Sequence, residues 1–256
     1  MSDIHGHLEK LVPALHTAGL TDADGNWTAD DTRLWFLGDF FDRGPDGIGV
    51  LRYVRGLFEQ APDDAVRMLL GNHEILALGM HKFGDDFVPH DGISLRSFER
   101  SWALNGGQDR DQELLTDDDV AWLIEQPVLG ADAGHLLMHS DTTEYVEWGD
   151  TLDEINAAAY AELHTDDIEV WWEIWRRMTS RYAFRGASGP EVARSLLHHL
   201  GGRRIVHGHS IVADQLGIDP RFLTGPHLYA DDLVLGIDGG AFDGGPCLVV
   251  ELEPLS

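Results

Sequence analysis

Residues 71–74 read Gly-Asn-His-Glu and directly follow a short apolar run, so three ligand-capable side chains meet at one corner of the chain. Comparable polar side chains stand near the start of the chain and at the ends of three other apolar runs. The full set is Asp3, His5, Asp39, Asp42, Asn72, His73, His139, His207 and His209. Carboxylate and imidazole together suit divalent metals such as Mn²⁺, Fe²⁺ and Zn²⁺. The set contains no thiol, which disfavours a zinc-finger-like structural site.

Each of these residues has an ordinary explanation when it is taken alone. Asn72 could cap the helix that follows, Asp39 could be a turn residue, and a histidine at a strand end is more often packed than metal-bound. A turn, however, does not select Asp, Asn or His at five separate places. Two metal ions about 3.5–4 Å apart need a bridging carboxylate and several flanking ligands. The set is large enough for such a pair, with Asp39 at its centre.

The elements that must position these residues are short buried strands. Apolar runs at 33–44, 66–74, 135–141 and 203–210 each end in Asp, Asn or His, and residues 46–61 have helical apolar spacing. This order predicts an α/β sheet, in which ligands gather outside the carboxyl ends of the strands. Residues 232–253 predict two further strands joined by a glycine-rich turn. No strand precedes Asp3, so either the natural start lies upstream or the chain has been shortened.

Composition limits the partners of the chain. Its 256 residues are enough to bury a sizeable core, and its formal net charge of −27 disfavours binding to nucleic acid or to an anionic membrane surface. Cys247 is the single cysteine, so no intramolecular disulfide forms. Neither a secretory leader nor a run of 18 apolar residues is present, which predicts a soluble, cytoplasmic protein. The sequence does not indicate an oligomeric state.

The middle of the chain predicts an insertion rather than a second domain. Residues 142–188 are rich in acidic residues and end in a helix that carries Trp171, Trp172 and Trp175, and no proline- or glycine-rich linker flanks them. We therefore expect a single domain over residues 1–256, with a helical, cap-like insertion at about 142–188. The tryptophans are most simply the packed face of a helix, and a cap over a cleft is the alternative.

Five motifs in order carry a resemblance to a known family. "SDIHGH", "GDFFDRG", "GNHE", "MHSD" and "GHS" resemble the motif set of the calcineurin-like metallophosphoesterases. The closest resemblance is to the phosphoprotein phosphatase branch, with its bacterial members and the symmetrical diadenosine tetraphosphatases. The resemblance implies a four-layer α/β/β/α sandwich of two mixed central β-sheets. The sequence departs from the family pattern at Ser2 and in the Ser-Asp pair that follows His139.

The resemblance also implies roles for individual residues. One metal would be held by Asp3, His5 and His209 and the other by Asn72, His139 and His207, with Asp39 bridging both. His73 would be the general acid, paired with Asp42. The substrate would be bound by Arg43, by Arg185 with Arg181 in reserve, and by Asn105 of the tract "WALNGG".

The function implied is phosphomonoester hydrolysis by water activated at two divalent metal ions, with Mn²⁺ expected and Fe or Zn as alternatives. The leading hypothesis is a serine/threonine protein phosphatase that acts on a phosphorylated protein or peptide. A second hypothesis is a hydrolase of dinucleoside polyphosphates or another small phosphoester, in which Trp102 or the tryptophan helix would contact an adenine. A third is a non-catalytic binding platform, which predicts lost ligands.

Overall fold

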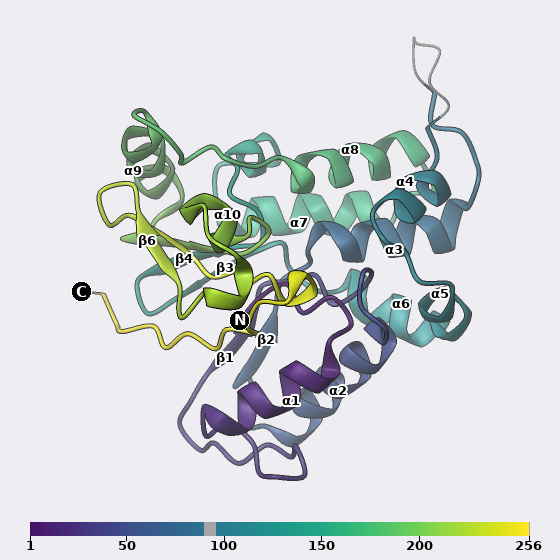
Figure 1. Cartoon of the computed structure of the whole chain (residues 1–256). Coiled ribbons are helices and arrows are strands. Elements are labelled where there is room, and N and C mark those ends of the chain that lie inside the picture. The colour runs from purple at the N-terminus through teal and green to yellow at the C-terminus, as the bar shows by residue number, and fades with distance from the viewer. Residues whose placement is uncertain (90–95, 256) are drawn as a thin grey trace.

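Two β-sheets lie at the centre of the protein, with helices on either side. The structure, a computed structural model, describes residues 1–89 and 96–255. From bottom to top, Figure 1 shows helices α1 and α2, the strands β1 and β2, the five strands of a second sheet, and helices α7 to α9. The expected α/β fold with two sheets is confirmed.

The strands form one parallel pair and one mixed sheet. The pair is β1 (Leu34–Phe36) and β2 (Val66–Met68), and the larger sheet has the order β3-β4-β5-β7-β6. Its strands are β3 (Leu129–Asp132), β4 (His135–Met138), β5 (Arg204–His207), β6 (His227–Tyr229) and β7 (Val234–Gly236). Strands β4, β5 and β7 are parallel, while the outer strands β3 and β6 run antiparallel to their neighbours.

The described residues form ten α-helices and three short 3₁₀ turns. The α-helices are α1 (Leu8–Thr17), α2 (Gly47–Gln60), α3 (Asn72–Phe83), α4 (Phe98–Leu104), α5 (Asp109–Leu114), α6 (Asp117–Ile124), α7 (Leu152–Leu163), α8 (Ile168–Thr179), α9 (Gly189–Leu200) and α10 (Val212–Leu216). The 3₁₀ turns are η1 (Glu144–Glu147), η2 (Pro220–Phe222) and η3 (Ala241–Asp243). Within residues 1–89 and 96–255, no helix combines the length and the apolar character needed to cross a membrane.

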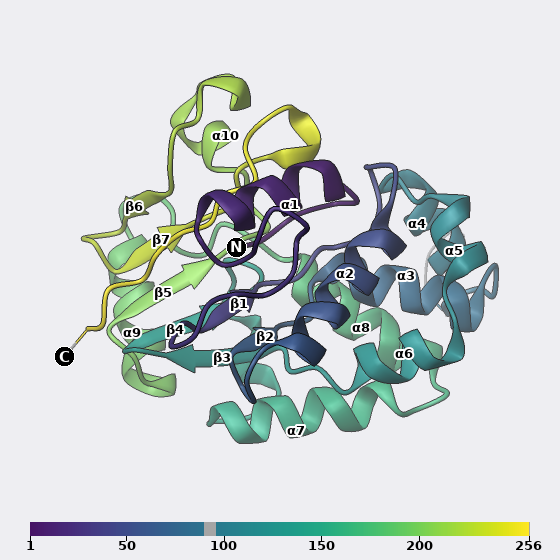
Figure 2. The same ribbon diagram turned by 90° about the horizontal axis from the view of Figure 1, so that it is seen from below.

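Apolar side chains from both sheets meet between them. Leu37 and Leu69 follow β1 and β2, and they pack against Leu137, Val206 and Leu235 of β4, β5 and β7. A larger core joins the outer faces of the sheets to the helices. This packing brings the carboxyl ends of β1, β2, β4, β5 and β7 together, and it sets the loops that follow them side by side (Figure 2).

The N-terminal segment runs alongside β1 without being assigned as a strand. The Leu37 amide donates to the Met1 carbonyl at 2.9 Å, and the amides of Asp3 and His5 donate to the carbonyls of Gly38 and Asp39 at 3.1 and 3.0 Å. These hydrogen bonds fix the backbone that carries Asp3 and His5. The sequence pattern around residues 1–5 could not predict them, because the partners lie more than 30 positions away.

The C-terminal segment corrects one expectation. Residues 234–236 form β7, but residues 244–255 are not assigned to a strand. Cys247 and Val249 face the larger core, whereas Val250 and Leu252 face the core between the sheets. The apolar residues of this segment correctly indicate that it is buried between two layers. Burial alone, however, does not mean that the segment pairs with a neighbouring strand by backbone hydrogen bonds.

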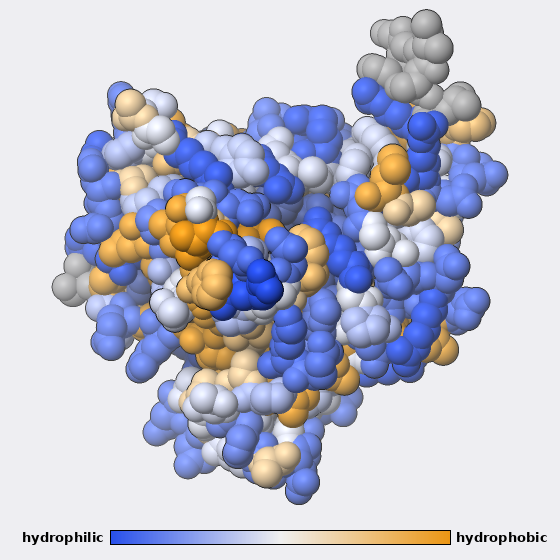
Figure 3. Space-filling model, viewed as in Figure 1, coloured by the Kyte–Doolittle hydropathy of each residue, from blue (hydrophilic) through white to orange (hydrophobic). Residues whose placement is uncertain are grey.

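Residues 142–188, predicted as an insertion, contain η1, α7 and α8. Trp171 is buried and its ring lies 5.8 Å from that of Phe83, and the Trp172 ring lies 5.4 Å from that of Phe98. The tryptophans thus pack against α3 and α4, as the packed-face interpretation predicts. Figure 3 shows a mainly hydrophilic surface on this side of the molecule, with apolar side chains gathered around α10 and the C-terminal segment.

Candidate metal centre

A buried carboxylate joins the loops that follow β1 and β2. Glu74, in the first turn of α3, accepts hydrogen bonds from the backbone amides of Asp39, Phe40 and Gly71 at 2.7, 2.7 and 2.8 Å. Gly38 has to be glycine here, because a Cβ would lie 2.4 Å from the Gly71 nitrogen. Glu74 therefore holds the two ligand loops together, a role the sequence analysis did not assign although Glu74 lies in its central motif.

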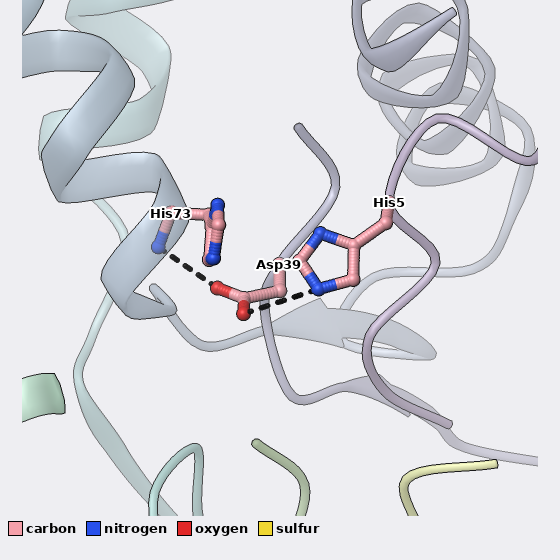
Figure 4. A group of neighbouring side chains, drawn as sticks. All are labelled: His5, Asp39 and His73. Carbon is pink, nitrogen blue, oxygen red and sulfur yellow. Dashed lines mark hydrogen bonds and ion pairs between the residues drawn. The ribbon is translucent and has the colours of Figure 1, made fainter. Parts of the chain in front are cut away.

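The first group of potential metal ligands consists of His5, Asp39 and His73, all buried (Figure 4). The His5 Nε2 atom lies 3.7 Å from Asp39 Oδ2, and the backbone amide of His73 donates to Asp39 Oδ1 at 2.9 Å. The imidazole rings of His5 and His73 have centroids 4.6 Å apart. Segments far apart in the sequence thus converge on one carboxylate.

The second group shares Asp39 and adds His139 and His209. The Nε2 atom of His139 lies 3.4 Å from Asp39 Oδ1 and 2.9 Å from the Asn72 side-chain oxygen. Its Nδ1 atom bonds the Leu37 carbonyl at 2.7 Å, which orients the ring. Asp39 is therefore the carboxylate common to both groups, at the position that a bridging ligand requires.

Asp3 lies directly beside the second group. Its Oδ2 atom accepts a hydrogen bond from the His209 amide at 2.8 Å and another from the Ser2 hydroxyl. Burial, with the nearby Asp39 charge, raises the pKa of Asp3. Two carboxylates this deeply buried need positive charge nearby, and divalent ions would supply it.

The histidines differ in their pKa and therefore in whether the ring must lose a proton before it binds a metal. Burial lowers the pKa of His5 and His209 well below the usual range, so both are neutral imidazoles, the form that ligates metals. Burial alone would also lower the pKa of His139, but Asp39 and Asp3 outweigh it and raise the pKa to about 9. The donor types fit two divalent ions, with a proton to be displaced from His139.

Metal binding is expected to be pH-dependent, because a metal at His139 must displace a proton. The protonated ring stabilises the metal-free fold below pH 6.5, and that contribution is lost as the pH rises to about 9. The affinity for Mn²⁺ should therefore rise about tenfold per pH unit above pH 6.5. Calorimetric titration at pH 6.5, 7.25 and 8.0 in buffers of different ionisation enthalpy measures both the affinity and the proton released. An affinity independent of pH would contradict this assignment.

His207, also predicted as a ligand, lies in neither group. Its Nδ1 atom lies 2.8 Å from the Gly208 carbonyl and its Nε2 atom 2.8 Å from the Tyr229 hydroxyl, so both ring nitrogens have other partners. The structure does not bring His207 to Asp39. His209, which the resemblance grouped with Asp3 and His5, lies instead with Asp39 and His139.

The predicted acid pair is in contact. His73 Nδ1 donates to Asp42 Oδ2 at 2.6 Å, and Trp102 Nε1 donates to Asp42 Oδ1 at 2.9 Å. Burial alone would lower the pKa of His73, but the charges of Asp39 and Asp42 outweigh it and raise the pKa. Trp102 is only 5% exposed, so of the two adenine contacts that the dinucleotide hypothesis offered, Trp102 and the tryptophan helix, Trp102 is not open to a base.

Arg43 lies against the first group. It donates to His5 Nε2 at 3.2 Å, its other terminal nitrogen lies 3.2 Å from His73 Nε2, and its guanidinium stacks on Phe242 at 4.1 Å. Burial lowers the pKa of His209 and of His207, and the charges of Arg181 and of Arg185 add to the two effects.

The Asn105 side chain binds the backbone of its own helix. Its side-chain amide donates to the Ser101 carbonyl at 2.8 Å, at the end of α4. The neighbouring Gly106 carbonyl accepts the Arg43 amide at 2.7 Å, so this segment supports Arg43 through its backbone. Phe242 and Tyr229 are further contacts that the sequence analysis missed, because both come from distant parts of the chain.

Comparison with known proteins identifies relatives of this chain. Over 136 residues it is 34% identical to a symmetrical bis(5′-nucleosyl)-tetraphosphatase of Pectobacterium carotovorum and 35% identical to one of Yersinia pestis. These matches cover 52% of the chain and 38% and 37% of the two relatives, so the chain spans less than two fifths of the curated relatives it matches.

Solved structures share the fold. A cold-active protein-tyrosine phosphatase of a psychrophilic Shewanella superposes with a TM-score of 0.70 at 22% identity, covering 96% of this chain and 72% of the other. A candidate diadenosine tetraphosphatase gives a TM-score of 0.53 at 16% identity, covering 95% of this chain and 83% of the other. The family model for calcineurin-like phosphoesterases matches residues 1–213. The chain belongs to the calcineurin-like phosphoesterase family.

Proposed function

We propose that this chain hydrolyses dinucleoside polyphosphates at a dinuclear metal centre. The observation that carries the proposal is a set of three arginines, Arg43, Arg181 and Arg185, without carboxylate partners. Among the described residues, no carboxylate lies within 4.0 Å of Arg43, Arg181 or Arg185, although the chain has 45 acidic residues. Guanidinium groups bind phosphate oxygens as planar, forked donors, and a polyphosphate offers several such oxygens. The names of the curated relatives support the same substrate class.

The ligand assignment that we propose starts from the two groups, keeps His73 as the acid and assigns Asp3 to the first ion, as the family resemblance implies. Asp3, His5 and Asp39 would hold one ion, and Asp39, Asn72, His139 and His209 the other. Two ions so placed would supply Lewis-acid activation of water and neutralise phosphate oxygens. A metal bound at His5 Nε2 would also displace the hydrogen bond from Arg43 and free that guanidinium for a phosphate.

The protein residues then have distinct tasks. His73 would protonate the leaving oxygen from Nε2, because the hydrogen bond to Asp42 keeps its other proton on Nδ1. Arg43 would hold the transferred phosphoryl group, and Arg185 and Arg181 the remaining phosphates. Burial of His73 and Asp42 excludes water from this proton path.

Phosphoprotein hydrolysis is the second candidate. The structural neighbours with phosphatase activity are about 22% identical and support only the shared fold. A panel of diadenosine tetraphosphate, a phosphothreonine peptide and p-nitrophenyl phosphate, assayed with Mn²⁺ and with EDTA, separates the two. We expect kcat/KM for the dinucleotide to exceed that for the peptide at least about tenfold, a difference of about 1.4 kcal/mol. The reverse order would make the protein phosphatase hypothesis the better one.

Trp102→Phe tests whether the hydrogen bond from Trp102 to Asp42 helps to position His73, the proposed general acid. The substitution removes the indole N–H that donates to the buried Asp42 carboxylate, a bond to a charged group worth about 1.5–3 kcal/mol. We expect kcat to fall about tenfold or more with unchanged metal content, because Asp42 no longer fixes His73. Trp27→Phe is the matched control, since the Trp27 indole nitrogen has no hydrogen-bond partner among the described residues. Equal kcat values for both variants would remove Trp102 from the proposed machinery.

A further inference from the structure

One buried carboxylate, Asp141, joins the loop between α8 and α9 to the loops that carry His139 and His209. Asp141, fully buried, lies two residues after His139; its Oδ2 atom accepts the Tyr182 amide at 3.1 Å and its Oδ1 atom the Ser210 hydroxyl at 2.6 Å. Its carbonyl also accepts the Ala183 amide at 2.9 Å. At the start of the loop, the Thr179 carbonyl lies 3.1 Å from His209 Nε2. Residues 179–183 therefore contact His209 and the segment that follows His139.

Tyr182 in this loop has an unfavourable backbone conformation. Its φ of 75° lies in the left-handed region, which is costly for an aromatic residue. The described residues that share this property include six from the predicted site: Asp3, His5, Asp39, Asp42, Arg43 and His209. Such strain persists where the surroundings fix the backbone, and it clusters at binding and catalytic sites. The Asp141 hydrogen bonds are what fix Tyr182.

The Tyr182 side chain is exposed to solvent and not packed in the core. It is 48% exposed, although its backbone is anchored to a fully buried carboxylate. The Arg185 guanidinium lies 4.0 Å from the ring centroid and that of Arg181 lies 5.8 Å away. The Arg185 Nε atom is buried and has no hydrogen-bond partner among the described residues. An exposed aromatic ring next to two arginines offers a stacking surface beside two phosphate-binding groups.

We propose that Tyr182, Arg181 and Arg185 form a nucleotide subsite beside the metal centre, in which a nucleobase stacks on Tyr182 and the arginines bind the phosphates that are not being cleaved. This inference rests on the proposed function and names the residues that make the site prefer a dinucleotide over a simple phosphomonoester. Stacking of one base on an aromatic side chain corresponds to roughly a five- to hundredfold effect on affinity.

The test compares Tyr182→Gly, Tyr182→Phe and, as a matched control, Tyr160→Ala. Tyr160 is 44% exposed, on α7. Tyr182→Gly removes the ring and also relieves the left-handed strain, so we expect it to melt at or above the wild-type temperature. We expect the ratio of KM for diadenosine tetraphosphate to KM for p-nitrophenyl phosphate to rise about tenfold in Tyr182→Gly and to stay at the wild-type value in Tyr182→Phe and Tyr160→Ala. Inhibition by ADP should weaken in Tyr182→Gly by the same factor, relative to inhibition by inorganic phosphate.

The outcomes separate the subsite from the proposed function. An unchanged KM ratio in Tyr182→Gly, with the dinucleotide still hydrolysed, would overturn the subsite alone. A rise of equal size in Tyr160→Ala would overturn it too, because the effect would then not belong to this loop. A wild-type chain that hydrolyses p-nitrophenyl phosphate but not diadenosine tetraphosphate would overturn the proposed function and the subsite with it.

Discussion

Asp39→Asn should remove one or both metal ions and nearly all turnover in one step. Asp39 is the carboxylate that faces His5 on one side, at 3.7 Å, and His139 on the other, at 3.4 Å. The amide oxygen of asparagine can still accept the His73 amide, so the loop should keep its shape while the negative charge between the two ions is lost. We expect metal content to fall from about two ions per chain to one or none. We expect kcat/KM to fall on the order of 10³-fold, about 4 kcal/mol of transition-state stabilisation.

Elemental analysis and kinetics on the same preparations measure both effects. Asp31→Asn is the matched control, because it makes the same chemical change at an exposed position away from the ligand groups. A variant at position 39 that keeps two ions and wild-type turnover would exclude Asp39 as the bridge. A wild-type chain that binds no metal and hydrolyses none of the three substrates would favour the non-catalytic platform.

His73→Asn should lower kcat by about 10²–10⁴-fold, the range typical of a lost general acid. The loss should be larger for an alkyl phosphate than for p-nitrophenyl phosphate, because a stable leaving group needs little protonation. Metal content should stay at the wild-type level if His73 acts as the acid. Since His73 also lies in the first ligand group, this measurement is decisive for its role.

A leaving-group series on wild type, His73→Asn and His81→Asn makes the comparison. His81 lies on the same helix, α3, but is exposed, so its replacement controls for the loss of an imidazole on this helix. A loss of one metal ion in His73→Asn, with an equal loss of turnover for all leaving groups, would show that His73 is a ligand and not the acid.

The sequence was most informative where the signal is local. A buried strand followed by a turn is a short pattern, and four such runs predicted β1, β2, β4 and β5 together with the polar residues at their ends. In parallel strands, those ends meet at the same edge of a sheet, so the convergence on Asp39 followed from topology. The family resemblance added the expected roles of His73, Asp42 and Arg43, and the structure places His73 in contact with both Asp42 and Arg43.

Other features depend on residues that are close in space but distant in sequence. His207 and His209 are only two positions apart, and no local pattern distinguishes them. The left-handed backbone at His209, with a φ of 62°, turns that ring toward Asp39, while Tyr229 of β6 binds the ring of His207. The bond from Trp102 to Asp42 spans 60 positions, so it too was beyond the sequence.

The sequence by itself determined which donor types are present, in what order, and at which strand ends they stand. Only the tertiary structure decided which histidine faces which carboxylate. It also decided that Asp141, part of the Ser-Asp pair that departs from the family pattern, binds the loop of Tyr182. Likewise, only the structure shows that Trp102 is buried against Asp42 and is not open to a ligand. The physical reason is that apolar spacing reports burial, whereas the direction of a polar side chain depends on loop backbone angles and on partners brought in from elsewhere in the chain.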